Sequence, residues 1–210
     1  MADEPQMKNH QQVGQKALSS NKFAPVSCQD AVSLALEFFP ELKAVPIRFF
    51  HQPSVAPHKS CPTSQSFFRS PGKRIYDVIL SARTVPEISD LCFDNLRFRE
   101  QVGLVAHELA HITQYQSYGF ADLIKNYLAY LSEPKRTAIE QKVDKKVVEH
   151  GLGWELYAYA NARERAAIDN PVVQYLDQFH LSPEDIMHYM QNLNRSSKID
   201  FKIDLTYNLN

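Results

Sequence analysis

The sequence of 210 residues has almost no excess of charge of either sign and contains only six glycines. Lysine and arginine together number 23 and the acidic residues 24, which gives a net charge of −1 at pH 7. A general nucleic-acid-binding domain usually has a basic stripe or a pI above about 9, so we expect no nucleic-acid partner. The glycines form neither a phosphate-binding loop nor a Gly-x-Ser-x-Gly turn. Phosphoryl transfer and serine-hydrolase chemistry are therefore excluded.

Long apolar runs are also missing. The most apolar segment, residues 120–131, is interrupted by Asp122 and Lys125, and it is far shorter than the roughly 20 residues needed to cross a bilayer. The first eight residues contain no apolar core of the kind that a signal peptide requires. We therefore expect a soluble cytoplasmic protein without a membrane span, while secretion without a leader peptide stays open.

Cysteine is scarce. The three cysteines, Cys28, Cys61 and Cys92, cannot all pair with one another, and none belongs to a Cys-x-x-Cys motif. They predict no structural zinc site, and reduced thiols in the cytosol fit this pattern best. Two further interpretations stay open. One is a single disulfide, Cys28–Cys61 or Cys61–Cys92, and the other is a Cys61 thiolate that caps a metal ion and inhibits it.

The most informative stretch that is present is residues 101–115, which contain the pattern His-Glu-x-x-His at His107, Glu108 and His111. Apolar residues at helical spacing flank the pattern and predict a helix that is buried on most sides. Residues four apart share one face of a helix, so both imidazoles can point at one metal ion. With a third protein ligand they leave the fourth position of Zn²⁺ open to water, and Glu108 can accept a proton from that water.

A second segment offers the third ligand. We expect a helix over residues 134–150, on which Glu140 and Asp144 lie one turn apart. Glu140 can complete the protein ligands, while Asp144 can accept the ring N–H of a metal-binding histidine and fix its orientation. Glu164 is the rival third ligand, and it ranks second because no acidic residue follows it on the same helix face. Both glutamates also have basic neighbours, as solvated helix faces commonly do.

This arrangement resembles the gluzincins, the thermolysin-like metallopeptidases in which a glutamate on a second helix is the third zinc ligand. The resemblance depends on His107-Glu108-x-x-His111 followed by Glu140-x-x-x-Asp144. Small bacterial zincin-like proteins with a Gln-Val-Gly-x-x-x-His-Glu-Leu-Ala-His helix, here residues 101–111, are more similar still. The resemblance covers roughly residues 45–165. It implies a zinc-dependent peptidase in which Glu108 is the general base and the substrate is a peptide or a protein.

The length and a hydrophobic content of 44% fit one well-packed domain. We expect an α+β fold: a helix-rich, zincin-like domain with a small antiparallel or mixed β-sheet packed on the metal-binding helix. Residues 1–22 are predicted as a mobile tail, residues 23–194 as the metallopeptidase domain, and residues 195–210 as a C-terminal tail or strand. Alternation of apolar and charged residues over 199–205 predicts a strand that joins the sheet, a partner chain or a second copy.

Two short runs, residues 45–50 and 74–81, are rich in β-branched and aromatic residues and predict strands. If the second run lies at the edge of the sheet, its free backbone groups can pair with an extended peptide substrate. A Pro/Ser-rich loop between the runs can border the cleft. It contains His58 and Cys61 at a spacing that suits metal ligands, but no second pair accompanies them, so we interpret His58 as a surface histidine.

The function that follows is hydrolysis of a peptide bond by a water molecule that Zn²⁺ and Glu108 activate. Candidate donors to the developing oxyanion are His150, Tyr157 and Tyr159, although aromatic residues at helical spacing are usually core residues. Two alternatives stay open. One is a metal-binding protein without catalytic turnover, and the other is an interaction module whose histidines are buried and hydrogen-bonded.

Overall fold

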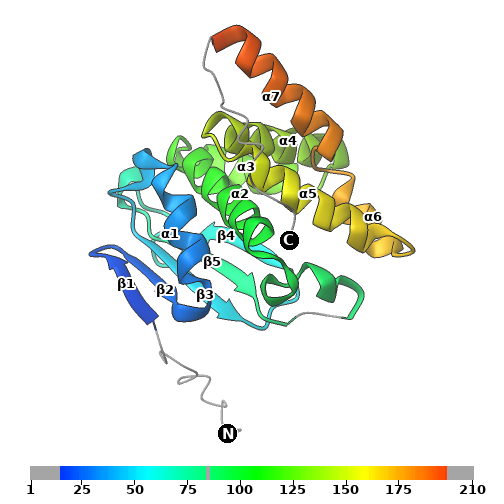
Figure 1. Ribbon diagram of the computed structural model, residues 1–210. Coiled ribbons are helices and arrows are strands. Elements are labelled where there is room, and N and C mark those ends of the chain that lie inside the picture. The colour runs from blue at the N-terminus through cyan, green and yellow to red at the C-terminus, as the bar shows by residue number, and fades with distance from the viewer. Residues whose placement is uncertain (1–14, 84–85, 198–210) are drawn as a thin grey trace, which may run out of the picture.

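The structure, a computed structural model, describes residues 15–83 and 86–197. Within these residues five strands and seven α-helices follow one another in the order β1 (Gln15–Ser19), β2 (Lys22–Pro25), α1 (Gln29–Glu37), β3 (Ile47–Gln52), β4 (His58–Pro62), β5 (Tyr76–Ser81), α2 (Phe98–Gln116), α3 (Phe120–Ala129), α4 (Glu133–Glu149), α5 (Gly153–Ala167), α6 (Pro171–Asp177) and α7 (Pro183–Ser197). Helices α1 and α2 lie against the sheet, and α4, α5, α6 and α7 gather beyond α2 (Figure 1). The fold is therefore α+β, as the sequence predicts.

The sheet is mixed. Its strand order is β1-β2-β3-β5-β4, with parallel pairing from β2 through β3 to β5 and antiparallel pairing at both ends. Alternate residues of β5, namely Tyr76, Val78 and Leu80, are fully buried. Strand β5 pairs with β3 on one side and β4 on the other, so the prediction that it could be an edge strand is wrong.

The edge strand on this side is β4, which lies within the segment that the sequence predicts to be a loop. Among the described residues β4 pairs only with β5. Its sequence, His-Lys-Ser-Cys-Pro, has no clear apolar alternation and ends in proline. Proline is tolerated in a strand that pairs on one side only, which explains why the strand exists without the usual sequence pattern.

The N-terminal boundary of the fold also differs from the prediction. Strands β1 and β2 form an antiparallel hairpin, and β2 continues in parallel to β3. The predicted tail over residues 1–22 is therefore too long, because residues 15–22 belong to the sheet or to its first turn. At the other end α7 continues to Ser197, so residues 195–197 are helical. The predicted strand over residues 199–205 lies outside the described residues.

Helix α2 lies at the centre of the molecule. It packs against α1, α4, α5 and β4, and every residue from 102 to 112 is buried. Helices α4, α5 and α7 share one continuous core with the sheet, whereas α6 packs in a smaller separate cluster. None of the helices in the described residues combines the length and the apolar character that crossing a bilayer requires. The central position of α2 means that its polar residues are held by packing on several sides.

Helices α2 and α5 are in close backbone contact at Gly103. A Cβ atom at this position would lie 2.2 Å from the backbone oxygen of Glu155, and a backbone atom cannot move aside as a side chain can. We expect Gly103→Ala to lower the free energy of unfolding by about 2–3 kcal/mol through overpacking, measured by urea denaturation. The matched control is Gly72→Ala, where nothing lies within 4 Å of the new atom. Equal stability of the two variants would contradict this packing.

The three cysteines do not form the disulfides that the sequence leaves open. No disulfide joins Cys28 to Cys61 or Cys61 to Cys92. Cys28 and Cys92 are buried, and Cys61 is half-buried on β4. Cysteine therefore contributes to this fold as a small apolar side chain rather than as a cross-link.

Candidate metal centre

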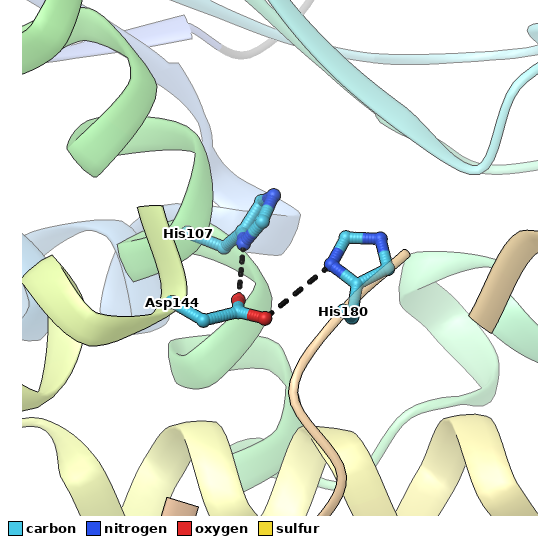
Figure 2. Close-up of side chains that lie close together, drawn as sticks. All are labelled: His107, Asp144 and His180. Carbon is cyan, nitrogen blue, oxygen red and sulfur yellow. Dashed lines mark hydrogen bonds and ion pairs between the residues drawn. The ribbon is translucent and has the colours of Figure 1, made fainter. Parts of the chain in front are cut away.

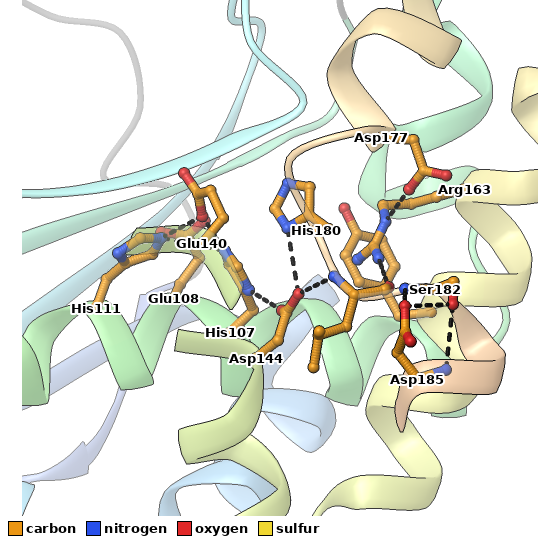
Figure 3. Close-up of polar contacts among 12 residues, drawn as sticks. His107, Glu108, His111, Glu140, Asp144, Arg163, Asp177, His180, Ser182 and Asp185 are labelled. Atoms are coloured by element: carbon orange, nitrogen blue, oxygen red, sulfur yellow. Dashed lines mark hydrogen bonds and ion pairs between the residues drawn. The ribbon is translucent and has the colours of Figure 1, made fainter. Parts of the chain in front are cut away.

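His107 and His111 extend from one face of α2, and Glu140 extends toward them from α4 (Figure 3). The Nε2 atoms of the two histidines are 3.1 Å apart. Oε2 of Glu140 lies 3.2 Å from each of them. All three side chains are buried. The three atoms form a nearly equilateral triangle, so the structure brings together the three residues that the sequence predicts as metal ligands.

The triangle has nearly the dimensions of a zinc site. At zinc–ligand distances of about 2.0–2.2 Å and tetrahedral angles, two ligand atoms lie about 3.3–3.6 Å apart, which is slightly more than the 3.1–3.2 Å of the triangle. Although Oε2 of Glu140 is within ion-pair distance of both imidazoles, it forms no hydrogen bond of acceptable geometry within the described structure. The two Nε2 atoms lie within hydrogen-bond distance of each other, and all three atoms face one common point. Two imidazoles and one carboxylate are a donor set that suits Zn²⁺.

Asp144 is fully buried below His107 and connects it to His180 (Figure 2). Its Oδ1 accepts a hydrogen bond from Nδ1 of His107 at 2.9 Å. Its Oδ2 accepts the backbone N–H of Leu181 at 2.9 Å and lies 3.5 Å from Nδ1 of His180. The contact from Asp144 fixes the proton of His107 on Nδ1 and leaves Nε2 directed at the triangle. This is the contact that the spacing of Glu140 and Asp144 predicts.

His111 is held differently. Its Nδ1 has no hydrogen-bond partner in the described part of the chain. Its ring instead stacks on Tyr115, with the ring centres 5.9 Å apart and the planes 19° from parallel. Packing rather than a carboxylate therefore orients the second imidazole.

The buried charges of this site determine its protonation. Burial would raise the pKa of Asp144, but His107 and His180 outweigh it and lower that pKa. Burial opposes ionisation of Glu140 in the same way, and His111 with His107 lowers its pKa. Burial would lower the pKa of His107, but the two carboxylates raise it to about 10. Both carboxylates are thus ionised at neutral pH, and a metal ion that binds here displaces a proton from His107.

Glu108 lies beside the triangle with its carboxylate buried. Nδ1 of His58 donates a hydrogen bond to Oε1, and Nε2 of His58 forms a hydrogen bond of 2.8 Å with the hydroxyl of Tyr159. Oε2 has no hydrogen-bond partner in the described structure, and the side chain lines a cavity of about 700 Å³. Burial would raise the pKa of Glu108, but the surrounding histidines, His58 first among them, lower it to about 2. Glu108 is therefore an ionised carboxylate with one oxygen available to a ligand.

The interpretation of His58 as a surface histidine is wrong. The residue lies on β4, is half-buried and makes both of its contacts inside the site. It is 50 positions from Glu108 and 101 from Tyr159 in the sequence. No local pattern could have indicated these contacts, since they depend on the position of β4 at the sheet edge.

His180 is a second site residue that sequence reasoning missed. It follows α6 in a short connection, and its ring centre lies 5.1 Å from that of His107. His107, Asp144 and His180 form another group of converging ligand atoms. Both oxygens of Asp144 already accept hydrogen bonds, however, so this second group has less capacity for a metal ion than the triangle.

Helix α5 presents only one of its three predicted site residues to the cavity. Tyr159 is fully buried, lines the cavity and contacts His58. Tyr157 packs beside Trp154 instead, because residues two apart on a helix point to different faces. Glu164 is exposed and does not line the cavity. The rival third ligand and the Tyr157 candidate are therefore excluded.

His150 does not belong to the site either. Its Nδ1 donates to the backbone oxygen of Lys146 at 2.7 Å, and its Nε2 lies 2.8 Å from a carboxylate oxygen of Glu41. The ring stacks on Phe39 at 4.3 Å between centres. These contacts place His150 at the end of α4, where it closes the helix against the α1 region, and not in the cavity.

This cavity opens over the triangle of His107, His111 and Glu140. Strand β4 and the residues before it line one side, and the triangle, Glu108 and His180 line another. Cys61 also lines the cavity, but burial raises the pKa of its thiol. Its sulfur belongs to neither group of converging ligand atoms in the described residues. The contacts therefore give no support to Cys61 as an inhibitory thiolate ligand.

The chain matches no protein-family model, no curated protein and no solved structure. The function proposed below therefore depends on the residues and the geometry of the site itself.

Proposed function

We propose that this protein is a zinc-dependent hydrolase of peptide bonds, of the gluzincin type that its motif resembles. The observation that supports it most strongly is the triangle of Nε2 of His107, Nε2 of His111 and Oε2 of Glu140, with sides of 3.1–3.2 Å. A buried carboxylate with a free oxygen lies directly beside it, and a cavity large enough for a peptide segment opens over both. Three protein ligands next to an accessible cavity are typical of catalytic zinc sites.

Each residue has a role that follows from its contacts. His107, His111 and Glu140 would hold a Zn²⁺ ion, which would supply Lewis-acid chemistry to the scissile carbonyl and lower the pKa of water toward about 7. Glu108, ionised at neutral pH, accepts a proton from the attacking water on Oε2 and passes it to the leaving amine. His58 holds Oε1, so it fixes the direction of the free oxygen. Tyr159 and His180 both line the cavity and are the candidate donors to the developing oxyanion.

Strand β4 supplies a means of holding an extended substrate. Its outer edge makes no pairing with any other described strand, and its residues line the cavity next to Glu108. A peptide that adds to such an edge forms backbone hydrogen bonds that do not depend on its side chains. A peptide or protein substrate therefore fits the site better than a small molecule without a backbone. The sequence offers residues 74–81 for this role only if they lie at the sheet edge, and we propose it for β4 because β4 is the edge strand next to the cavity.

The test of this proposal measures bound zinc and hydrolysis on the same preparation. We expect about one zinc per chain after dialysis, cleavage of peptides in a mixed library, loss of cleavage with a chelator and recovery with added zinc. Less than a tenth of a zinc per chain would remove the metal from the proposal. Stoichiometric zinc without cleavage of any peptide would instead indicate a metal-binding protein without turnover.

A further inference from the structure

Two arginines line the cavity close to His180, and the roles proposed so far use neither. Arg136 comes from α4 and Arg163 from α5. They contact the same short segment before α7, because Arg136 stacks on Phe179 and Arg163 donates to the backbone oxygen of Leu181. His180 lies between these two contacts in the sequence. In Figure 3 it also lies between the metal-binding triangle and Arg163.

Arg163 is buried, and one nitrogen of its guanidinium group has no hydrogen-bond partner in the described structure. Only 3% of its surface is exposed. Nε donates to Asp177 at 2.7 Å, and Nη2 donates to the backbone oxygen of Leu181 at 3.0 Å. The remaining nitrogen, Nη1, is buried and has no hydrogen-bond partner in the described structure. Burying an N–H of a charged group without an acceptor costs free energy. A ligand that supplies an acceptor to this nitrogen would therefore be stabilised.

Arg136 shows the same feature on the other side of the segment. Its guanidinium lies 4.0 Å over the ring of Phe179. Stacking of this kind orients the guanidinium but satisfies none of its donors. Its Nε is buried without a hydrogen-bond partner, and the ion pairs of the described residues include none that involves Arg136. The cavity is thus lined by two oriented cations, each with an unsatisfied donor.

The position of Arg136 relates these donors to the metal centre. Arg136 lies four residues before Glu140 on α4, so it occupies the same helix face about 6 Å away along the axis. An extended peptide advances about 3.3 Å per residue. A group held at Arg136 is therefore about two residues from a peptide bond positioned at the triangle. Guanidinium groups bind carboxylates by paired, charge-assisted hydrogen bonds.

We propose that Arg136 and Arg163 form a subsite for a carboxylate of the peptide substrate, one or two residues from the scissile bond. This inference rests on the proposed hydrolase function and specifies its substrate class. The carboxylate is either the free C-terminus of the peptide or an aspartate or glutamate side chain. Both sources offer the same carboxylate group to the subsite. Peptides that carry only one of the two carboxylates distinguish between these sources.

The experiment compares kcat/KM of the zinc-loaded protein on three peptides of otherwise identical sequence. The first ends in a free carboxylate and contains only neutral side chains. The second is amidated and carries one aspartate near the cleavage site, and the third is amidated with asparagine there. We expect the third to be cleaved about 10- to 100-fold less efficiently than the better of the others, as loss of a charge-assisted hydrogen bond predicts. The better substrate identifies the source of the carboxylate.

Arg136→Gln is the variant of choice, because Arg163 also holds Asp177 and Leu181 and its loss could unfold the region. We expect Arg136→Gln to reduce kcat/KM on the preferred peptide to the value for the neutral one, and to leave the neutral one unchanged. Lys135→Gln, which removes an exposed charge from the neighbouring position, is the control and should change neither. Equal cleavage of all three peptides by the unaltered protein would overturn the carboxylate subsite and leave the hydrolase function standing.

A binding measurement separates this inference from failure of the hydrolase proposal. If no peptide is cleaved, calorimetric titration with N-acetyl-dialanine and with its C-terminal amide tests the subsite directly. Tighter binding of the free acid that disappears in Arg136→Gln supports the subsite. Equal binding of the acid and the amide rejects it.

Discussion

Replacing Glu108 by glutamine is expected to lower kcat/KM on any cleaved peptide by about 10³-fold, within the range of roughly 10² to 10⁴ that general-base catalysis contributes. Glutamine has nearly the same size and can keep a hydrogen bond with His58. Its amide cannot accept a proton at neutral pH, however, and the free Oε2 is the atom that does so in the proposed mechanism. Because Glu108 lies outside the triangle of ligand atoms, the variant should still bind about one zinc per chain.

The control for this variant is Glu184→Gln, which makes the same chemical change at an exposed position on α7. It should leave kcat/KM and the zinc content unchanged. If Glu108→Gln keeps more than a tenth of the activity, Glu108 is not the base. If it folds normally but no longer holds zinc, Glu108 acts as a ligand and the assignment of Glu140 has to be revised.

The central helix and its metal-binding residues could be predicted because their signals are local. His107 and His111 are one helical turn apart, and the apolar residues around them follow the same period. Glu140 and Asp144 repeat this spacing on a second helix. When two such helices cross, one face of each meets the other, so both pairs of side chains arrive at the same point. The structure shows this convergence, with Glu140 at the imidazoles and Asp144 behind His107.

The rest of the site could not be predicted because it depends on how distant segments meet. His58 reaches Glu108 only because β4 pairs with β5 at the end of the sheet. The order of strands is not encoded in the apolar pattern of any one strand, which is also why β5 was a plausible edge from its sequence alone. His180 reaches Asp144 through a short connection between α6 and α7. Neither histidine is part of a motif.

Helix α5 shows why the spacing of residues along the sequence could not distinguish Tyr159, which lines the cavity, from Tyr157, which does not. Tyr157 and Tyr159 have the same chemistry, and which of them faces the cavity depends on the rotation of α5 against α2. At Gly103 the backbone of Glu155 comes so close that no side chain fits, and the Cβ atom of Tyr159 lies beside the same position. The packing places Tyr159 against His58 and leaves Tyr157 beside Trp154. The contact between α5 and α2, which no pattern within α5 describes, is thus what distinguishes the two tyrosines.

Glu140→Gln is expected to abolish stable zinc binding, with less than a tenth of a zinc per chain after dialysis. The carboxylate supplies the only negative charge among the three ligands, and an amide oxygen is a much weaker donor to a metal ion. Zinc present at 100 times its Kd stabilises a protein by about 2.7 kcal/mol, which for a domain of this size is a rise in Tm of about 5–10 °C. The unaltered protein should show this rise on zinc addition, and Glu140→Gln should show none.

Glu164→Gln is the matched control for Glu140→Gln, because Glu164 is the other glutamate that the sequence offers as third ligand and its side chain is exposed on α5. It should keep the zinc content and the zinc-dependent rise in Tm of the unaltered protein. The two variants together show which glutamate is the third ligand. Zinc is lost in Glu140→Gln if the ligand is Glu140, and in Glu164→Gln if the ligand is Glu164. Zinc loss in Glu164→Gln with zinc retained in Glu140→Gln would reverse the assignment, and the triangle around His107 and His111 would then not be the metal centre.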